Sequence, residues 1–186
     1  QFHMNKNDLY CNAGMYLVDL KKWREEKVED KIIKRIHEQN GNVFFFEQTL
    51  MNWSCSGKIL QLPPKYNAYT LFWAFTYKNL ICWRKPNAFY LESEVEEAKD
   101  NPIIIHFTRN FYMLSRPWIK GCDHPKTKEY VKYKLLTPWK QLEEDNRSKK
   151  SIRRYKLWHI IPQRILAIGA GVIYNEVRPK LWWKNE

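Results

Sequence analysis

At 186 residues the chain is long enough for one domain with a substantial core, and a 44% hydrophobic content without low-complexity tracts excludes a largely disordered protein. The net charge of +12 is uneven, because residues 147–186 hold ten Lys or Arg against two Glu, whereas residues 1–146 hold 22 basic and 18 acidic side chains. The basic C-terminal segment therefore predicts an anionic partner, either a membrane or a nucleic acid.

The first half of the chain predicts strands that alternate with helices. An apolar run at residues 13–18 predicts a strand, and Asp19 can cap a helix whose apolar spacing continues to Gly41. A second helix is expected at residues 47–55, followed by a brief strand at residues 58–62.

The second half continues this alternation. Residues 65–90 are rich in aromatic side chains and are expected to be irregular, whereas residues 92–99 predict a solvated helix. The β-branched run at residues 101–107 predicts a fully buried strand, and a helix is expected from residue 124 to about residue 139. The alternation indicates an α/β class, but three short strands are too few for a complete sheet, so we expect further strands from elsewhere.

Residues 141–150 predict a linker, and residues 151–186 predict a basic amphipathic helical tail. The tail residues expected to bind a membrane are Arg153, Arg154, Lys156, Trp158, Trp182 and Trp183. The most apolar stretch, residues 165–174, is shorter than the roughly 20 residues that span a bilayer. We therefore expect peripheral binding to an anionic surface; the alternative is a helix pair packed on the domain.

The four widely spaced cysteines lack a CxxC pair, which favours buried free thiols in a reducing compartment over disulfides or a zinc site. The chain opens Gln-Phe-His-Met, without a signal peptide or an initiator Met at position 1, so we expect it to continue a sequence upstream.

Four ordered blocks form a specific pattern. They are YCNAGMYLVDLKKW at residues 10–23, FFFEQTLMN at residues 44–52, LQLPPKYN at residues 60–67, and IIIHFT at residues 103–108 with RPW at residues 116–118. They resemble the segments F-N-[AS]-G-V-x-L-[IV]-[DN]-L-x-x-W, D-Q-D-x-L-N, L-P-x-x-[FY]-N and I-[IV]-H-[FY]-x-G…K-P-W of the family 8 retaining glycosyltransferases. The resemblance implies the C-terminal portion of a GT-A-type nucleotide-diphospho-sugar transferase fold, with a mixed sheet and flanking helices, over residues 1–140.

The resemblance also implies roles for particular residues. Asn12 and Glu47 would hold donor-sugar hydroxyls, and Gln48 would lie near the anomeric carbon, where a neutral amide is a better electrostatic stabiliser than a nucleophile. His106 matches one protein ligand of Mn²⁺ (or Mg²⁺), whose other ligands are an Asp-x-Asp motif. Arg116 matches a Lys that contacts the leaving phosphate, and Arg109 is also expected at the diphosphate.

The chain departs from the pattern at three positions. Glu47 replaces an Asp and lengthens the reach of the carboxylate, Thr49 replaces a second Asp and removes its charge, and Arg109 stands where the family has a Gly beside the diphosphate. Asp-x-Asp occurs nowhere in the 186 residues. We therefore expect the nucleotide-binding half to be absent from this chain, which alone would then be inactive.

The resemblance implies retaining transfer of a hexose from a UDP-sugar to a glycan or lipid-linked acceptor, in lipopolysaccharide or capsular polysaccharide synthesis. We expect a cytoplasmic enzyme bound peripherally to the inner membrane face, with its acceptor contacting residues 66–90. The alternatives are a non-catalytic or truncated transferase domain, and a basic module that binds nucleic acid or membrane. No RNA-binding sheet motif or zinc-finger spacing accompanies the basic charge, so nucleic acid is not an expected partner.

Overall fold

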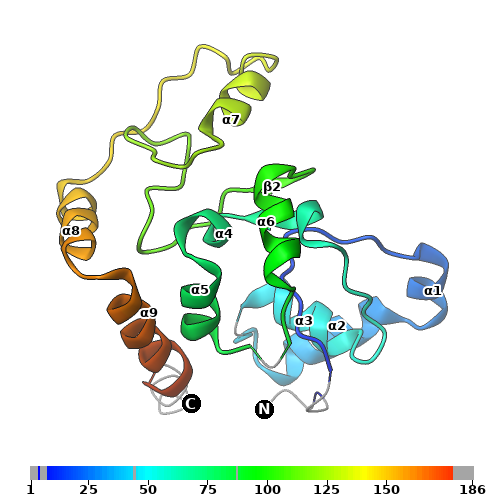
Figure 1. The fold of residues 1–186 in the computed structure, drawn as a ribbon. Coiled ribbons are helices and arrows are strands. Elements are labelled where there is room, and N and C mark those ends of the chain that lie inside the picture. The colour runs from blue at the N-terminus through cyan, green and yellow to red at the C-terminus, as the bar shows by residue number, and fades with distance from the viewer. Residues whose placement is uncertain (1–3, 5–7, 44, 87, 178–186) are drawn as a thin grey trace. The chain divides into compact units, whose positions relative to one another are not determined.

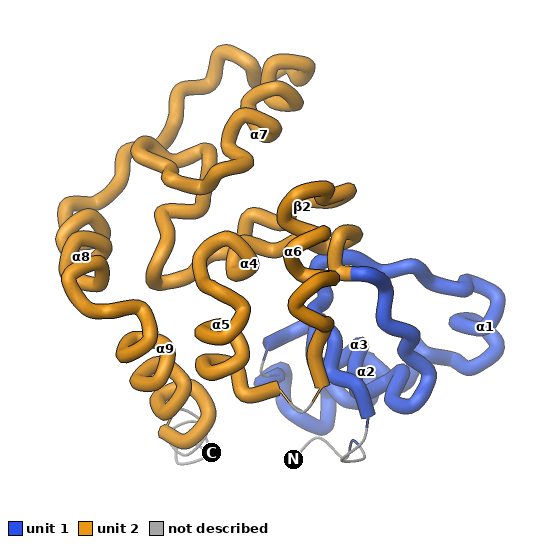
Figure 2. The backbone as a smooth tube through the Cα atoms, viewed as in Figure 1, with its two compact units in different colours: residues 1–63 blue, residues 64–186 orange. Residues whose placement is uncertain are grey.

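The computed structural model describes residues 4, 8–43, 45–86 and 88–177. The chain divides into two compact units, residues 1–63 (unit 1) and residues 64–186 (unit 2), shown in Figure 2. The division falls between Pro63 and Pro64, where two successive prolines cannot donate backbone hydrogen bonds. The domain limits predicted near residues 140 and 150 stay predictions.

Unit 1 is helical in its described part, with α1 (Leu20–Glu25), α2 (Val28–Glu38) and α3 (Phe46–Ser54). Asp19 caps α1 as expected, because its carboxylate accepts the N–H groups of Lys21 and Lys22 at 3.0 and 3.1 Å. The single helix predicted from Leu20 onward is interrupted, since Lys27 adopts a left-handed conformation with φ of 51°.

The end of α2 follows the Gly41 signal. Gly41 N–H donates to Ile36 O at 2.9 Å, and Asn40 N–H donates to His37 O at 3.0 Å. Both Asn40 and Gly41 have positive φ, at 48° and 78°. These two bonds satisfy carbonyls that the last turn leaves without helical partners, which is the Schellman arrangement.

The strands predicted at residues 13–18 and 58–62 do not form within the described residues. Leu17 is 86% exposed and Leu60 is 92% exposed, so neither segment lies inside a sheet. A short apolar run favours an extended chain, but a strand also requires a neighbouring strand to complete its hydrogen bonds. In contrast, the helix predicted at residues 47–55 is confirmed by α3.

Unit 2 contains many short elements (Figure 1). In chain order they are the 3₁₀ helix η1 (Pro64–Asn67), β1 (Ala68–Tyr69), α4 (Leu71–Ala74), α5 (Tyr77–Arg84), α6 (Glu92–Asp100), β2 (Ile105–His106), α7 (Thr127–Lys134), α8 (Lys149–Ile160), α9 (Gln163–Val172) and the π-helix η2 (Ile173–Val177). The helix predicted at residues 92–99 is confirmed by α6, whereas α7 begins three residues after His124.

The two strands pair in parallel, with Ala68 opposite Ile105 and Tyr69 opposite His106. The strand predicted at residues 101–107 is confirmed only at its end. It is not fully buried, because Ile103 is 56% exposed and a sheet of two short strands leaves most of the run without a neighbour.

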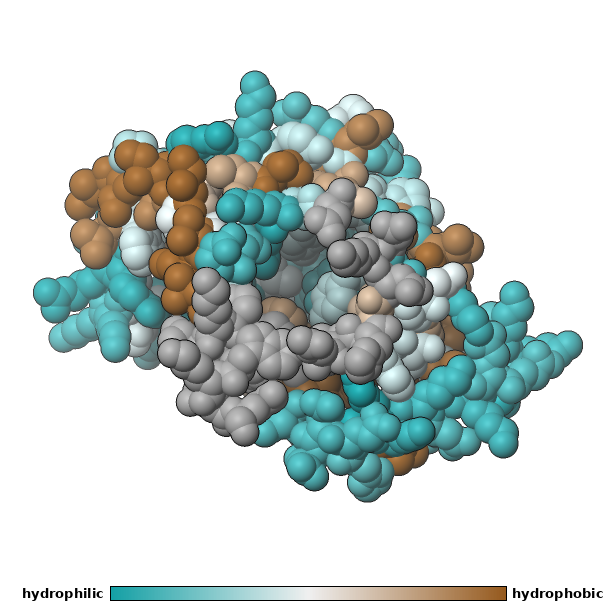
Figure 3. Space-filling view, turned by 90° about the horizontal axis from the view of Figure 1, so that it is seen from below, coloured by the Kyte–Doolittle hydropathy of each residue, from teal (hydrophilic) through white to brown (hydrophobic). Residues whose placement is uncertain are grey.

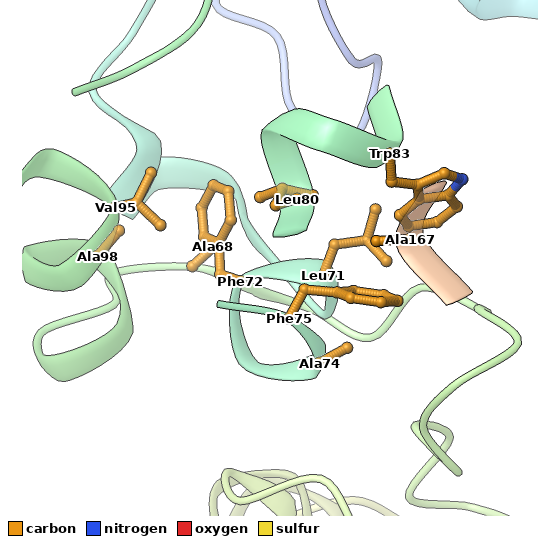
Figure 4. Close-up of a cluster of buried hydrophobic side chains, with 10 residues drawn as sticks. All are labelled: Ala68, Leu71, Phe72, Ala74, Phe75, Leu80, Trp83, Val95, Ala98 and Ala167. Carbon is orange, nitrogen blue, oxygen red and sulfur yellow. The ribbon is translucent and has the colours of Figure 1, made fainter. Parts of the chain in front are cut away.

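The aromatic stretch 65–90, expected to be irregular, provides most of the core of unit 2 (Figure 4). The buried cluster consists of Ala68, Leu71, Phe72, Ala74, Phe75, Leu80, Trp83, Val95, Ala98 and Ala167. The Phe75 ring lies 5.1 Å from the Trp83 ring and 5.8 Å from the Phe111 ring, between centroids. Aromatic rings therefore bury the area that a larger sheet would otherwise cover.

Helix α9 packs directly against α5. The Gln163 amide donates to Ala74 O at 3.0 Å and accepts from Asn79 Nδ2 at 2.7 Å. Just beyond α9, in η2, Asn175 Nδ2 donates to Trp83 O at 3.0 Å. The half of the predicted tail that forms α9 is thus part of the fold of unit 2.

The helix pair α5–α9 generates a prediction about two glycines of α9. A Cβ at Gly171 would lie 3.1 Å from Cys82 O and 3.2 Å from Trp83 O, whereas a Cβ at Gly169 would meet nothing within 4 Å. Gly169→Ala should stabilise the protein by about 0.5–1 kcal/mol through helix propensity. Gly171→Ala should instead be destabilising, because overpacking costs about 1–3 kcal/mol. Urea denaturation measures both; equal effects would show that α5 and α9 do not pack this closely.

Candidate functional site

In unit 1, Asn12 and Gln48 lie in direct contact although 36 residues separate them. Asn12 Nδ2 and the backbone N–H of Ala13 both donate to Gln48 Oε1, each at 3.2 Å. Asn12 Oδ1 accepts the N–H of Gly14 at 2.9 Å, which fixes the orientation of its amide. The structure therefore brings together two of the residues that the sequence assigned to the donor sugar.

A buried amide one turn further along α3 holds these two segments together. Asn52, only 1% exposed, accepts the N–H of Cys11 at 2.6 Å and donates to Cys11 O at 2.8 Å. Its other amide hydrogen is directed to Gln48 O at 2.7 Å. Sequence reasoning missed Asn52, although it closes the same block that contains Gln48.

Thr49 is also buried in the contact between α3 and the segment that contains Cys11. It is 1% exposed, and its hydroxyl is hydrogen-bonded to the Tyr10 hydroxyl at 2.9 Å. The loss of a carboxylate at this position is therefore compatible with packing, because an unpaired charge would be costly to bury there.

Glu47 is exposed in the first turn of α3 and lies near a phenol that sequence reasoning missed. Burial, followed by the negative charge of Glu47, raises the pKa of Tyr16 to about 12. The Tyr16 phenol is a hydrogen-bond donor at neutral pH, as any tyrosine is, and it lies near a carboxylate that only accepts. Tyr16 lies two residues after Gly14 in the first of the four blocks, at a position that the family pattern leaves unspecified.

In unit 2, Asn67 orients the ring of His106. Asn67 immediately precedes β1, and its Oδ1 lies 3.0 Å from His106 Nδ1 at the end of β2. An amide oxygen only accepts, so Nδ1 carries the ring proton and Nε2 keeps its lone pair. Burial lowers the pKa of His106, which favours the neutral ring at pH 7.

A neutral imidazole whose Nδ1–H is bound to an amide oxygen is the form in which histidine binds metals. His106 therefore fits the expected metal as one ligand. Across the described residues, no group of three or more His, Cys, Asp or Glu could hold an ion.

The four cysteines are free and half-buried, not fully buried as expected.

The two arginines expected at the diphosphate lie on the loop after β2. The Ser115 hydroxyl donates to Thr108 O at 2.7 Å, which returns the chain close to the end of β2 just before Arg116. The Arg116 guanidinium carbon lies 5.6 Å from the centre of the Trp118 ring, and its Nε is buried without a hydrogen-bond partner among the described residues. Arg109 is exposed on the same loop.

On α8 the structure places the described tail residues in different surroundings. Arg153, Arg154 and Lys156 are exposed, whereas Trp158 is half-buried, 6.0 Å from the Phe111 ring. Trp182 and Trp183 lie outside the described residues.

The described chain contains no single helix with the length and apolar character to cross a membrane. One pair, α8 with Gln163–Val177, meets those two criteria jointly, but it is bent by 113°. Apolar side chains gather at the left of the face drawn in Figure 3, next to hydrophilic ones.

A family model and several curated proteins match the chain. The glycosyl transferase family 8 model matches residues 2–120. The lipopolysaccharide 1,2-glucosyltransferase of Escherichia coli is 30% identical over 171 residues, which cover 89% of this chain and 45% of that protein. General stress protein A of Bacillus subtilis is 26% identical over 140 residues, which cover 73% of this chain and 45% of that protein.

A solved structure shows a similar fold. The WbbM bifunctional glycosyltransferase in its apo form matches with a TM-score of 0.55 and 18% identity, over 83% of this chain and 24% of that chain. The α/β, GT-A-like fold class is therefore confirmed, since the small parallel sheet and its helices agree with this match. The chain spans less than half the length of these curated relatives and about a quarter of the solved chain.

The contact between Asn67 and His106 generates a prediction for NMR. In ¹⁵N-labelled protein, His106 should carry its proton on Nδ1 and titrate below the ordinary histidine pKa of about 6.5. In the complete protein, Mn²⁺ should broaden the His106 ring signals first, and Asn67→Ala should raise the Mn²⁺ concentration required by about 10–100-fold. His37, exposed on α2, is the internal control, and its ring signals should not broaden at the same Mn²⁺ concentration. An Nε2-protonated ring, or broadening unaffected by Asn67→Ala, would rule out this ligand geometry.

Proposed function

The chain belongs to glycosyl transferase family 8, and from this premise we propose that the complete protein transfers a hexose from a UDP-sugar to a glycan or lipid-linked acceptor, with retention at the anomeric carbon. The name of the E. coli relative, a lipopolysaccharide glucosyltransferase, supports synthesis of a cell-surface polysaccharide. Two pneumococcal relatives named as glycosyltransferases support the same class of reaction.

The observation that carries this proposal is the contact of Asn12 with Gln48. Gln48 Oε1 accepts two N–H groups, from Asn12 and Ala13, and this leaves little lone-pair density for attack on carbon. The same bonds hold the amide dipole in one direction. A fixed dipole stabilises developing positive charge at an anomeric carbon without reorganising, so Gln48 is an electrostatic stabiliser in the proposed mechanism.

The donor sugar would be oriented by neighbouring polar groups of unit 1. The exposed Glu47 carboxylate accepts hydrogen bonds from sugar hydroxyls, and the Tyr16 phenol beside it supplies a donor. Asn12 adds an amide that can both donate and accept. Holding the ring by several hydroxyls lowers the entropic cost of reaching the reactive geometry.

In unit 2, His106 would hold Mn²⁺ or Mg²⁺ through Nε2. The remaining protein ligands would come from an Asp-x-Asp motif, which the 186 residues do not contain. When bound, the ion would neutralise charge on the leaving diphosphate. Arg116 and Arg109 would add further positive charge on the same loop. The Arg116 guanidinium lies over the Trp118 ring, and its buried Nε has no hydrogen-bond partner among the described residues, so it could still donate to an anion.

We also propose that α8 binds an anionic membrane, placing the enzyme peripherally at the cytoplasmic face of the inner membrane. One face of this helix gathers the side chains of Lys149, Lys150, Arg153, Arg154 and Leu157. Four cations beside an apolar side chain form the pattern of a helix that lies in a charged lipid interface. A lipid-linked acceptor would then be reached at that surface.

The role of Gln48 can be tested in the complete protein. Gln48→Ala should lower kcat by about 100-fold or more with little change in the donor KM, because the lost interaction is made mainly in the transition state. Gln61→Ala, an exposed glutamine outside the contact, is the control and should leave both constants unchanged. A higher donor KM at unchanged kcat would refute the role of Gln48. Failure of the complete wild-type protein to transfer any UDP-hexose would refute the proposed activity.

The membrane proposal is tested by charge reversal. Arg153→Glu with Arg154→Glu should weaken sedimentation with phosphatidylglycerol vesicles by about tenfold or more, since each basic residue contributes about 1 kcal/mol near such a surface. Lys21→Glu with Lys22→Glu on α1 changes the net charge equally and should have a smaller effect. Wild-type binding should also weaken as salt rises. Equal effects of the two double substitutions would contradict a specific role for α8.

A further inference from the structure

A cavity walled by aromatic rings lies beside α7, in the part of unit 2 formed by residues 118–145. It has a volume of about 460 Å³, within the range of about 300–1,000 Å³ that is usual for small-molecule sites. Its aromatic walls are Trp118, Tyr130, Tyr133 and Trp139. Tyr133 is 64% exposed and Trp139 is 65% exposed, so large areas of both side chains face solvent. Monomeric proteins seldom expose such clustered apolar surface without a use for it.

Hydrogen bonds hold the walls of this cavity in place. The chain returns after α7 and pairs with itself, since Asp145 N–H donates to Trp118 O and Lys120 N–H donates to Asp145 O, both at 2.9 Å. Between α7 and this bridge, Trp139 N–H donates to the Thr137 hydroxyl at 3.3 Å, and the Lys134 ammonium is bonded to the Leu142 carbonyl. The loop that carries Trp139 therefore has a defined shape, visible beyond α7 in Figure 1.

The polar groups at the cavity select its ligand. Glu143 and Asp145 line it with exposed carboxylates, and the Lys134 ammonium is directed to a carbonyl. Carboxylates accept hydrogen bonds from hydroxyl groups, while aromatic faces pack against apolar C–H surface. A pyranose presents both kinds of surface at once. Two carboxylates against one ammonium give the lining a net negative charge, which disfavours nucleic acid or an anionic headgroup at this position.

From this lining we propose that the cavity beside α7 binds a neutral saccharide, and that it is the binding site for the acceptor glycan. The first part rests on the cavity alone, and the second rests on the proposed transferase function. Acceptor contacts were expected from residues 66–90. The rings of Phe72, Phe75 and Trp83 in this stretch cannot make them, because they are buried in the core.

The cavity adjoins the end of the strand that carries His106. The residue after His106 is Phe107, whose ring lies 6.1 Å from the Tyr130 ring, and Tyr130 lies 6.0 Å from the Trp118 ring. The guanidinium carbon of Arg116, which is expected at the leaving diphosphate, lies 5.6 Å from the centre of the Trp118 ring. A glycan held against these rings would therefore extend toward the proposed phosphate site, as an acceptor must.

Saturation-transfer difference NMR with methyl β-D-glucopyranoside, lactose and cellobiose tests the site on the complete protein. We expect the wild-type protein to bind these sugars. Trp139→Ala should weaken the binding by about tenfold, which is the size expected for one lost aromatic contact. Leu136→Ala, on the same loop and 78% exposed, should not weaken it. Glu143→Gln should weaken binding several-fold, whereas the neighbouring Glu144→Gln, which does not line the cavity, should leave it unchanged.

Each outcome separates this proposal from the proposed transferase activity. Binding that depends on Trp139 in a protein without transfer activity supports the saccharide site and refutes the activity. Transfer with an acceptor KM unchanged by Trp139→Ala refutes the acceptor site and leaves the activity intact. No binding of any of the three sugars, or equal binding by Trp139→Ala, overturns the proposal. So does a Trp139-dependent association with anionic vesicles in place of sugar.

Discussion

The candidate donor-sugar site depends on one buried amide. Asn52 is joined to the backbone of Cys11 by two hydrogen bonds and to Gln48 O by a third, so a segment 41 residues away is held against α3. The residue after Cys11 is Asn12, and its contact with Gln48 follows from that placement. Because a buried amide left without partners costs about 1–3 kcal/mol, this arrangement strongly favours a single register of the two segments.

Signals that act over a few residues predicted the local structure well. Asp19 caps α1 and Gly41 helps to end α2, because both devices depend only on the nearest turn of helix. The strands at residues 13–18 and 58–62 were wrong because a strand requires a partner that local sequence does not specify. The same limit explains why only the end of the run at residues 101–107 became β2.

The sequence predicted which residues form the candidate site, but it did not predict which residues surround them. The motif blocks identified Asn12, Gln48 and His106 and the family to which the chain belongs, and the structure places each in a polar environment. The residues that set those environments were missed. Asn52 and Asn67 act by hydrogen bonding to groups 39–41 residues away, and such partners can be found only once the chain is folded.

The distribution of aromatic residues connects the fold to the acceptor proposal. Unit 2 has only one pair of two-residue strands, so rings from α4, α5 and the loop after β2 supply the buried area that a sheet would otherwise provide. Those rings are buried and stabilise the fold. Trp118, Tyr133 and Trp139 take no part in that cluster, yet they line one cavity beside α7 instead of being scattered singly. Because folding does not require their exposed area, a ligand that packs against rings is the better physical explanation for it.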